Sequence, residues 1–496
     1  MRPLLVLILL LLSGAALAAQ PPLSLPPEAL SREGALHALN RLGYGPRPGE
    51  VEQLAAMGVD RWIARQLDPE TIAEPAALTS RLGALPSLSE GDAELFRRDA
   101  QLGRDHSDAG REARKDYVRA VLLEAQTARL DRAVLSERQL QEVLVGFWFN
   151  HFNVFRGKGL DHVWVGAFEK EAIRPYVLGP FRLLLEATAR HPAMLFYLDN
   201  WKNSAPGRSG RPGEELGLNE NYARELMELH TLGADGGYSQ HDVTELARIL
   251  TGWGLRDRAE RPRFFGGGAR QPDFTMAFDP SRHDYGDKIL IGQRIKGEGW
   301  QEVERALDLL AASPATARHL SFQLAQYFVA DDPDPQLVAR MADAYLRSGG
   351  NIALVLRSMI ESPLFWAPQT VGHKFKTPFE YAVSALRATG VTPDDPRPLL
   401  GLLQQLGQPI YGIETPDGYK QVESAWLTPD AMTRRLSFAT ILGGGRLGEQ
   451  RFAVDEAALR GLLPAPLSPQ TSLALAGSEA RLRPALLLGS PEFMHR

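Results

Sequence analysis

Apolar residues recur at three- and four-residue spacing along most of the chain, a pattern that predicts amphipathic helices. The pattern is clearest in four consecutive segments joined by short connections, 300–310, 315–328, 336–347 and 352–360. A longer, highly charged helix with one exposed face is expected over 95–132. These patterns favour an all-α protein with a large, mainly helical globular fold.

A minor exception is expected near residues 274–292. Two short apolar runs, 274–278 and 288–292, favour the strands of a β-hairpin. The loop between them carries His283 and Asp284. This loop is either a simple turn that contains a histidine or a lid that presents one, and the sequence leaves both interpretations open.

The segment 219–253 holds the densest set of carboxylates, amides and histidines in the chain. Its sequence predicts two helices that are joined by the glycine-containing turn at 234–237. The first helix is expected to end at Gly233, and the second to begin at Ser239 with Asp242 as its capping-box partner. Because the connection is short, we expect the two helices to lie side by side.

At about 100° per residue, the first of these helices collects its polar side chains into one arc, formed by Asn221, Arg224, Glu225 and Glu228. His230 lies on the opposite side, so this helix alone cannot offer Glu225 and His230 to one metal ion. The arc is either a solvated face with an ion pair between Arg224 and Glu228 or the lining of a cleft. His230 is either a hydrogen-bonded core residue or a functional one.

A second polar run, FWFNHFNV at 147–154, ends a helix that is expected to begin with a capping box between Ser136 and Gln139. His151 falls on the apolar stripe of this helix, and Asn153 follows at its end. Both a core histidine that bonds to a carbonyl and a functional histidine fit this position.

The composition is that of an ordinary globular protein, with 496 residues of which 44% are hydrophobic and 23% charged. The net charge of −5, without a dense run of lysine and arginine, argues against nucleic acid as a main partner. The chain contains no cysteine, which excludes disulfides, thiol nucleophiles and thiolate metal sites. A metal would need histidine, carboxylate or amide ligands, and the sequence does not decide whether any metal or cofactor binds.

Residues 1–19 have the layout of a signal peptide, with Arg2, an apolar run and then small residues. A retained N-terminal anchor is the alternative. Residues 20–30 resemble a Pro-rich linker, and 31–496 are expected to form one large helical domain, with a possible C-terminal subdomain from about residue 376. No later stretch is long and apolar enough to span a membrane. We therefore expect a periplasmic or extracellular protein.

Several motifs together resemble those of a secreted bacterial family, the domain of unknown function 1800. They include RLGYGP at 41–46, FWFNHFNV at 147–154, HPAMLFYLDN at 191–200, the whole of 219–253 and SPATAR at 313–318. The resemblance extends over nearly the full mature chain. It implies a mainly helical exported protein, without an activity or catalytic residues to carry over. It also implies a possible exported partner, because the family is commonly encoded beside one that looks sulfatase-like.

Two functions of different class fit these residues. In the enzyme hypothesis, His151 or His230 acts as a base in a shared pocket, His283 and Asp284 close over it, and Glu225 orients the base or acts as the acid. Such a cluster would support hydrolysis, with or without a metal, of an extracellular glycan or ester. The residues expected to bind the substrate are Asn153, Asn219, Asn221, Arg224 and Glu228.

In the binding hypothesis, the same polar groups form a buried network that fixes helix packing, while the surface binds another exported protein. The two hypotheses differ in one observable property. An enzyme needs the cluster to line a pocket that solvent reaches, whereas a structural network is sealed and fully hydrogen-bonded. We favour the binding and assembly protein.

Overall fold

The computed structural model describes residues 22–207, 217–255, 276–464 and 466–496. The expected signal peptide, 1–19, therefore lies outside the described residues. Helices dominate the described part of the chain, and its β structure consists of three two-stranded sheets. The expectation of a mainly helical fold is confirmed. Among the described helices, none is long and apolar enough to cross a bilayer.

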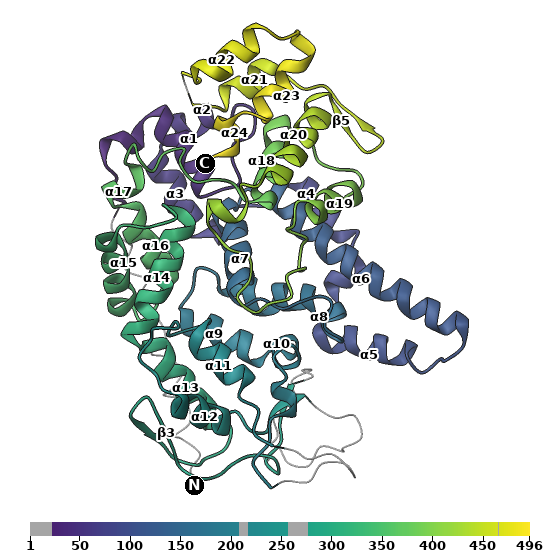
Figure 1. Ribbon diagram of the computed structural model, residues 1–496, viewed down its shortest axis with the longest axis vertical. Helices are drawn as coiled ribbons and strands as arrows, with labels where there is room; N and C mark the ends of the chain where they lie inside the picture. The colour runs from purple at the N-terminus through teal and green to yellow at the C-terminus, as the bar shows by residue number, and fades with distance from the viewer. Residues whose placement is uncertain (1–21, 208–216, 256–275, 465) are drawn as a thin grey trace, which may run out of the picture.

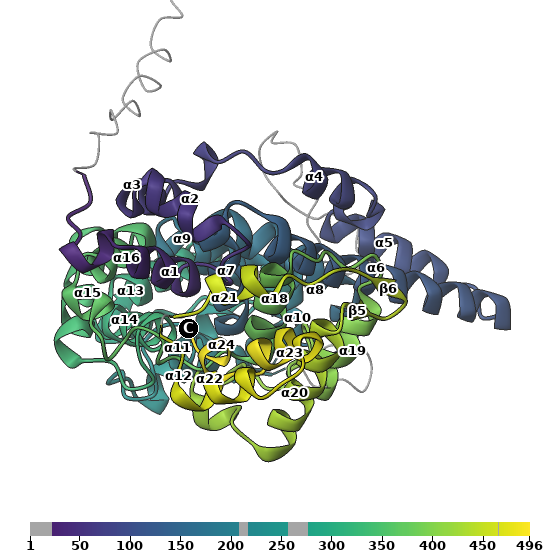
Figure 2. The same ribbon diagram turned by 90° about the horizontal axis from the view of Figure 1, so that it is seen from above.

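Helix α7 (Gln139–His151) lies near the centre of the molecule in both ribbon views (Figures 1 and 2). Nearly all its side chains are buried, which matches a sequence that is apolar almost all round the helix. The other helices of the first two hundred residues surround or extend from it. They are α1 (Arg32–Arg41), α2 (Glu50–Met57), α3 (Val59–Gln66), α4 (Ala76–Gly83), α5 (Asp92–Leu102), α6 (Asp108–Leu135), α8 (Asp161–Phe168), a π-helix (Glu169–Ile173), α9 (Phe181–Arg190) and α10 (Pro192–Tyr197).

The four consecutive amphipathic helices expected between residues 300 and 360 are confirmed. They form one edge of the molecule, on the left in Figure 1. Their bounds are α13 (Gln301–Ala312), α14 (Pro314–Phe328), α15 (Pro335–Arg347) and α16 (Ile352–Ile360).

The C-terminal helices gather at the opposite end of the molecule from α11 (Asn221–Glu228) and α12 (Gln240–Ile249), at the top of Figure 1. The last helix of the chain returns beside α1, as both ribbon views show (Figures 1 and 2). These helices are α18 (Pro378–Thr389), α19 (Arg397–Gln405), α20 (Pro429–Gly443), α21 (Glu456–Gly461), α22 (Pro469–Ala476), α23 (Arg483–Leu488) and α24 (Pro491–Met494), whereas α17 (Pro363–Trp366) packs against α16 at the left edge of Figure 1.

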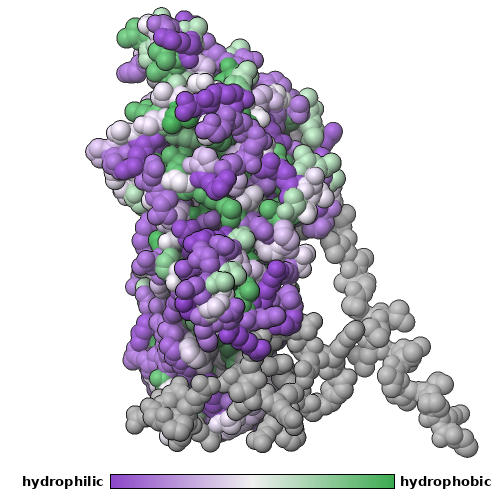
Figure 3. Space-filling model, turned by 90° about the vertical axis from the view of Figure 1, so that its right-hand side faces the viewer, coloured by the Kyte–Doolittle hydropathy of each residue, from purple (hydrophilic) through white to green (hydrophobic). Residues whose placement is uncertain are grey.

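The expected single helix over 95–132 is two helices, α5 and α6, so this prediction is wrong. Helix α5 ends at Leu102, and α6 begins at Asp108. The side chain of Ser107 caps α6 by accepting a hydrogen bond from the Gly110 amide at 3.0 Å. Arg114 of α6 pairs with Asp99 of α5 at 2.8 Å. The resulting hairpin projects from the body of the molecule (Figure 1), on the side whose largely hydrophilic surface is seen in Figure 3.

Short strands occur near 274–292 as expected, but their pairing differs from the expected hairpin. Strand β2 (Met276–Phe278) pairs with β1 (Trp253–Leu255), and β3 (Lys288–Leu290) pairs with β4 (Gln293–Ile295). Between β3 and β4, Ile291 and Gly292 both have positive φ, 49° and 72°, which is the backbone of a tight two-residue turn. A local turn therefore provides the partner of β3. The third sheet pairs β5 (Arg446–Leu447) with β6 (Gln450–Arg451).

The two helices expected within 219–253 are confirmed as α11 and α12, and they pack against each other, but α11 ends at Glu228 and not at Gly233 as expected. The capping box at the start of α12 is also confirmed. The Ser239 hydroxyl accepts a bond from the Asp242 amide, and the Asp242 carboxylate accepts one from the Ser239 amide at 2.8 Å.

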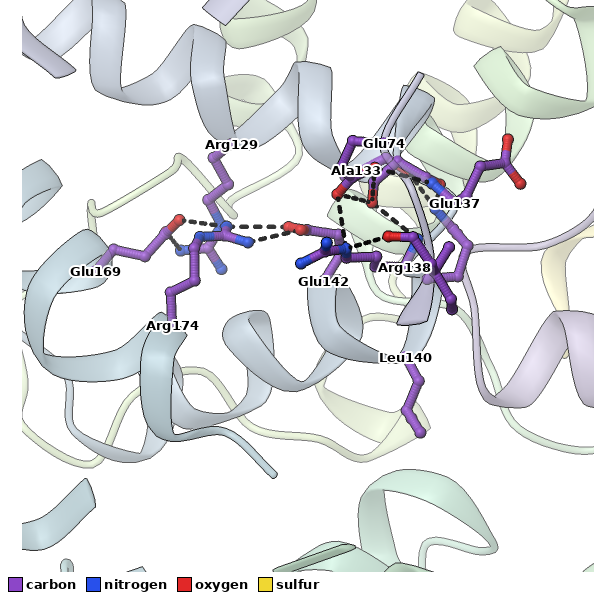
Figure 4. Close-up of polar contacts among 12 residues, drawn as sticks. Glu74, Arg129, Ala133, Glu137, Arg138, Leu140, Glu142, Glu169 and Arg174 are labelled. Carbon is purple, nitrogen blue, oxygen red and sulfur yellow. Dashed lines mark hydrogen bonds and ion pairs between the residues drawn. The ribbon is translucent and has the colours of Figure 1, made fainter. Parts of the chain in front are cut away.

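The capping box expected between Ser136 and Gln139 is wrong. Ser136 ends α6, and its hydroxyl donates to the Glu74 carboxylate at 2.8 Å. The Gln139 amide donates back to the Ser136 carbonyl at 2.8 Å, while its side-chain oxygen accepts from the Tyr44 amide at 3.0 Å. The side-chain groups that a local cap would need are thus bound to Glu74 and Tyr44, which lie far away in the sequence. Figure 4 shows the connection between α6 and α7 where these bonds form.

Candidate functional site

Two of the predicted histidines meet in the interior. His151 ends α7 and His230 follows α11, and their rings lie 6.0 Å apart between centroids. His151 Nε2 donates to the His230 carbonyl at 3.1 Å. A third imidazole, His319 of α14, lies 6.5 Å from His151 and donates to the Leu229 carbonyl at 3.3 Å. We call His151, His230 and His319 the imidazole cluster.

The imidazole cluster is uncharged near neutral pH. Burial, reinforced by His319, lowers the pKa of His151 to about 3. Burial also lowers the pKa of His230 and that of His319, because a positive charge would lose its hydration there. In the part of the chain that the structure describes, no group of three or more histidine, aspartate and glutamate side chains is placed to hold a metal ion. The cluster is a packed element of the core.

His283 and Asp284 do not close over this cluster. His283 Nε2 lies 2.9 Å from Glu302 Oε1, and its Nδ1 lies 2.8 Å from the Thr251 carbonyl. Lys288 pairs with the other oxygen of Glu302 at 2.5 Å, and the side chains of His283, Lys288 and Glu302 are completely buried. Asp284 pairs instead with Arg248 at 2.7 Å. The loop therefore forms a sealed ion-paired network and presents no histidine to solvent.

The predicted substrate-binding residues on and before α11 mostly bind the protein itself. Asn219 and Asn221 donate to the carbonyls of Asp199 and Leu198, at 3.3 and 3.1 Å, and so hold the turn after α10. The expected ion pair between Arg224 and Glu228 is not found, because Arg224 pairs with Glu220 at 3.4 Å and with the Gln240 side chain at 3.1 Å. Asn221 is exposed, while Arg224, Glu225 and Glu228 are half-buried, which confirms the polar face.

The last predicted binding residue, Asn153, leads to a feature that the sequence did not indicate. Its amide donates to the carbonyls of Ile413 and Thr415, at 3.2 and 2.9 Å. Asn150, one turn earlier, exchanges two hydrogen bonds with the backbone of Tyr419, at 2.7 and 3.0 Å. Both asparagines thus hold the segment 408–421, which crosses the middle of the molecule between α19 and α20 (Figure 1). We call this segment the strap.

A cavity of about 60 Å³ lies between the strap and the body of the protein. Its volume admits a few water molecules or one small group of a ligand. The walls carry a guanidinium, a carboxylate, side-chain amides and phenols. The polar groups come from Tyr44, Arg129, Asn150, Asn153, Tyr327, Glu380, Gln408, Tyr411, Tyr419 and Gln421.

Carboxylates lie at the edge of the strap. Burial, followed by the charges of Glu228 and Asp417, raises the pKa of Glu225. Burial alone would also raise the pKa of Asp417, but hydrogen bonds from Lys420 at 2.7 Å and Thr415 at 2.6 Å hold it below its usual range. Two carboxyl groups within electrostatic reach of each other therefore have opposite tendencies to hold a proton.

A buried network of ion pairs binds the strap to the body of the protein (Figure 4). Tyr411 of the strap donates to Glu169 at 2.8 Å. Glu169 also pairs with Arg129 and with Arg174, each at 3.1 Å, and Arg174 binds Glu142 at 2.6 and 3.0 Å. Burial would raise the pKa of Glu169, but the charges of these arginines outweigh it and hold the pKa low. Glu169 begins the π-helix, a conformation that is frequent at functional sites.

Sequence reasoning missed His319, the strap and the ion network. The only feature of the sequence that pointed to His319 was its position beside the apolar face of the helix expected at 315–328. Glu142 was detectable in principle, because a carboxylate on a helix that is apolar nearly all round needs a buried partner. Nothing in the sequence names that partner.

Comparison with known proteins adds one finding. A family model described as "Protein of unknown function (DUF1800)" matches residues 37–495, nearly the whole chain. No curated protein and no solved structure matches.

Proposed function

The chain belongs to the DUF1800 family, and from its own geometry we propose that it is an exported binding and assembly protein whose ligand site is the strap. The observation that carries this proposal is the cavity under the strap, with its convergent amide, phenol, guanidinium and carboxylate groups. The histidines favoured by the enzyme hypothesis are buried, and His283 is fully hydrogen-bonded, which supports the proposal as well, while His230 Nε2 has no partner within the described chain.

The chemistry of the cavity favours a neutral, hydroxyl-rich ligand such as part of an extracellular glycan. Its two charged groups already have partners, because Arg129 pairs with Glu169 at 3.1 Å and Glu380 with Arg496 at 2.8 Å. A charged ligand would introduce a buried charge without a counterion, which is costly. Hydroxyl groups can both donate and accept, and so match amides and phenols without that cost.

Export and partnership complete the proposal. Export rests on the signal-like leader at 1–19. The partner that we propose is another exported protein, of the sulfatase-like family that the DUF1800 resemblance implies. The protein would then bring a glycan at the strap and this partner together.

The site is tested by removing one amide. Asn153→Ala takes away a cavity group and two bonds to the strap, so we expect it to weaken the binding of neutral oligosaccharides at least tenfold, about 1.4 kcal/mol. Isothermal titration with a panel of such oligosaccharides measures the change. The matched control is Asn221→Ala, which removes an amide bond to a carbonyl away from the cavity. Equal affinity in the two variants would contradict a ligand site at the strap.

A further inference from the structure

A second cavity, of about 80 Å³, lies where α1 meets the C-terminal part of the chain. Its walls include His37 and Asn40 of α1, Lys376 just before α18 and Ser384 on α18. Exposed residues at its rim, among them Glu33, show that the cavity reaches the surface. It shares none of the carboxylates at the strap.

Inside this cavity, the Lys376 Nζ lies 2.9 Å from the Ser384 Oγ. Lys376 is 3% exposed, and within the described chain its only other hydrogen bond is to the Phe493 carbonyl, at 2.7 Å. The Phe493 ring faces the amine as well, with its centroid 4.2 Å from Nζ, so an ammonium group has three partners here. A neutral amine keeps its bond to the Phe493 carbonyl and can accept the proton of Ser384.

Burial favours the neutral amine. Together with the charges of Arg496 and Arg435, burial outweighs the opposing charge of Glu380 and lowers the pKa of Lys376 to about 7. The other titratable groups of the cavity are Glu33, His37, Glu492 and His495. A lysine that loses its proton near neutral pH can take a proton from an adjacent hydroxyl.

Two further features leave room for a reaction at Ser384. Gly45 has a φ of +91°, and a Cβ at this position would lie 2.8 Å from the Ser384 Oγ, so only glycine leaves that side of the hydroxyl open. Asn40 also lines the cavity, and its Oδ1 would lie 3.4 Å from the same Cβ. His37 is buried, and its Nδ1 has no partner, which a water or a ligand hydroxyl in the cavity would satisfy.

We propose that Ser384 is a nucleophile, activated by Lys376, which accepts the acyl group of a small ester in this cavity. The cavity volume suits an acyl group of a few heavy atoms, such as acetyl. This proposal is independent of the strap and of its ligand.

The chemistry balances without a cofactor. Lys376 takes the proton of Ser384 as the Oγ attacks the ester carbonyl carbon, and a new ester bond forms at Ser384. The bond to the leaving alcohol breaks, and that oxygen receives the proton from Lys376. Water then attacks the acyl-serine while Lys376 takes its proton and passes it to the Ser384 oxygen, which releases the carboxylic acid.

The test uses p-nitrophenyl acetate with the full-length mature protein. We expect nitrophenolate release with acetylation of Ser384, located by peptide mass spectrometry, at a rate that increases as the pH rises through about 7. Ser384→Ala should abolish the adduct, and Lys376→Met should slow its formation at least 100-fold, with circular dichroism verifying that each variant is folded. The matched control is Ser321→Ala, which removes a buried, unpartnered hydroxyl outside the cavity and should change nothing.

Two results would overturn the proposal. One is acetylation confined to other residues in the wild-type protein, with no adduct at Ser384 between pH 6 and 9. The other is nitrophenolate release by a folded Ser384→Ala variant at the wild-type rate. A Ser384 adduct whose rate is unchanged in folded Lys376→Met would also overturn it, because the lysine would then have no part in the activation.

Discussion

Acidification from pH 7.5 to pH 5 should cost the folded protein about 6 kcal/mol of its free energy of unfolding through three buried histidines, while buried carboxyl groups whose pKa is raised, Asp161 foremost, act in the opposite direction. Burial lowers the pKa of three histidines to about 3, assisted by Arg41 at His37, by His319 at His151 and by Lys170 at His191. In the unfolded chain a histidine has its ordinary pKa of about 6.5.

The sign follows from these values. Above pH 6.5 both states are uncharged at these positions, and the full stability is present. As the pH falls from 6.5 towards 3, the unfolded chain binds protons that the folded protein excludes, so stability is lost. Each histidine costs about 2 kcal/mol at pH 5, which for three is comparable with the whole stability of many proteins. His230 and His319 add to the loss in the same direction.

Urea unfolding at several pH values between 7.5 and 5 measures the effect, with circular dichroism as the signal. His191→Asn provides the decisive variant, because the His191 ring caps α10 by accepting a bond from the Ala193 amide at 3.2 Å, and asparagine is a good cap without a titrating group. The His191→Asn substitution should reduce the slope of the free energy of unfolding against pH, below pH 6.5, by about 1.4 kcal/mol per pH unit. The exposed His106→Gln should leave the dependence unchanged. An unchanged dependence in His191→Asn would show that His191 is not held neutral.

Local patterns predicted what depends on neighbours along the chain. Helical periodicity placed α11 to α16, and turn chemistry placed the capping box at Ser239. The apolar positions of His151 on its helix and of His230 in the expected helical pattern led to the correct expectation that they share an interior.

Contacts between distant segments could not be predicted in this way. Asn153 is a polar residue at a helix end, and its pairing with carbonyls about 260 positions later is set by where the chain returns. Lys376 and Ser384 lie two turns apart on and before one helix, but only the packing of α1 and Phe493 around them creates a buried lysine. The same holds for His283, whose partner Glu302 lies beyond a strand pair that the sequence assigned differently.

Replacing Glu169 by glutamine should destabilise the protein by about 3–5 kcal/mol, because it leaves buried arginine charge without its counterion. Glu169 is 3% exposed and is the ion-pair partner of Arg129 at 3.1 Å. Arg174 would keep Glu142, but Arg129 has no other ion pair within the described chain. The free energy of unfolding in urea at pH 7.5 measures the loss.

Two comparisons separate unpaired charge from the simple loss of contacts. Glu112→Gln breaks a pair with Lys115 whose side chains are both more than half exposed, so we expect a change within about 0.5 kcal/mol. The double variant Glu169→Gln, Arg129→Met removes both charges and should recover a substantial part of the loss. A cost below about 1 kcal/mol for Glu169→Gln would indicate that water reaches Arg129. Because Tyr411 donates to Glu169, Glu169→Gln should also loosen the strap. Weaker oligosaccharide binding by the folded Glu169→Gln protein would show that this ion network also supports the proposed ligand site.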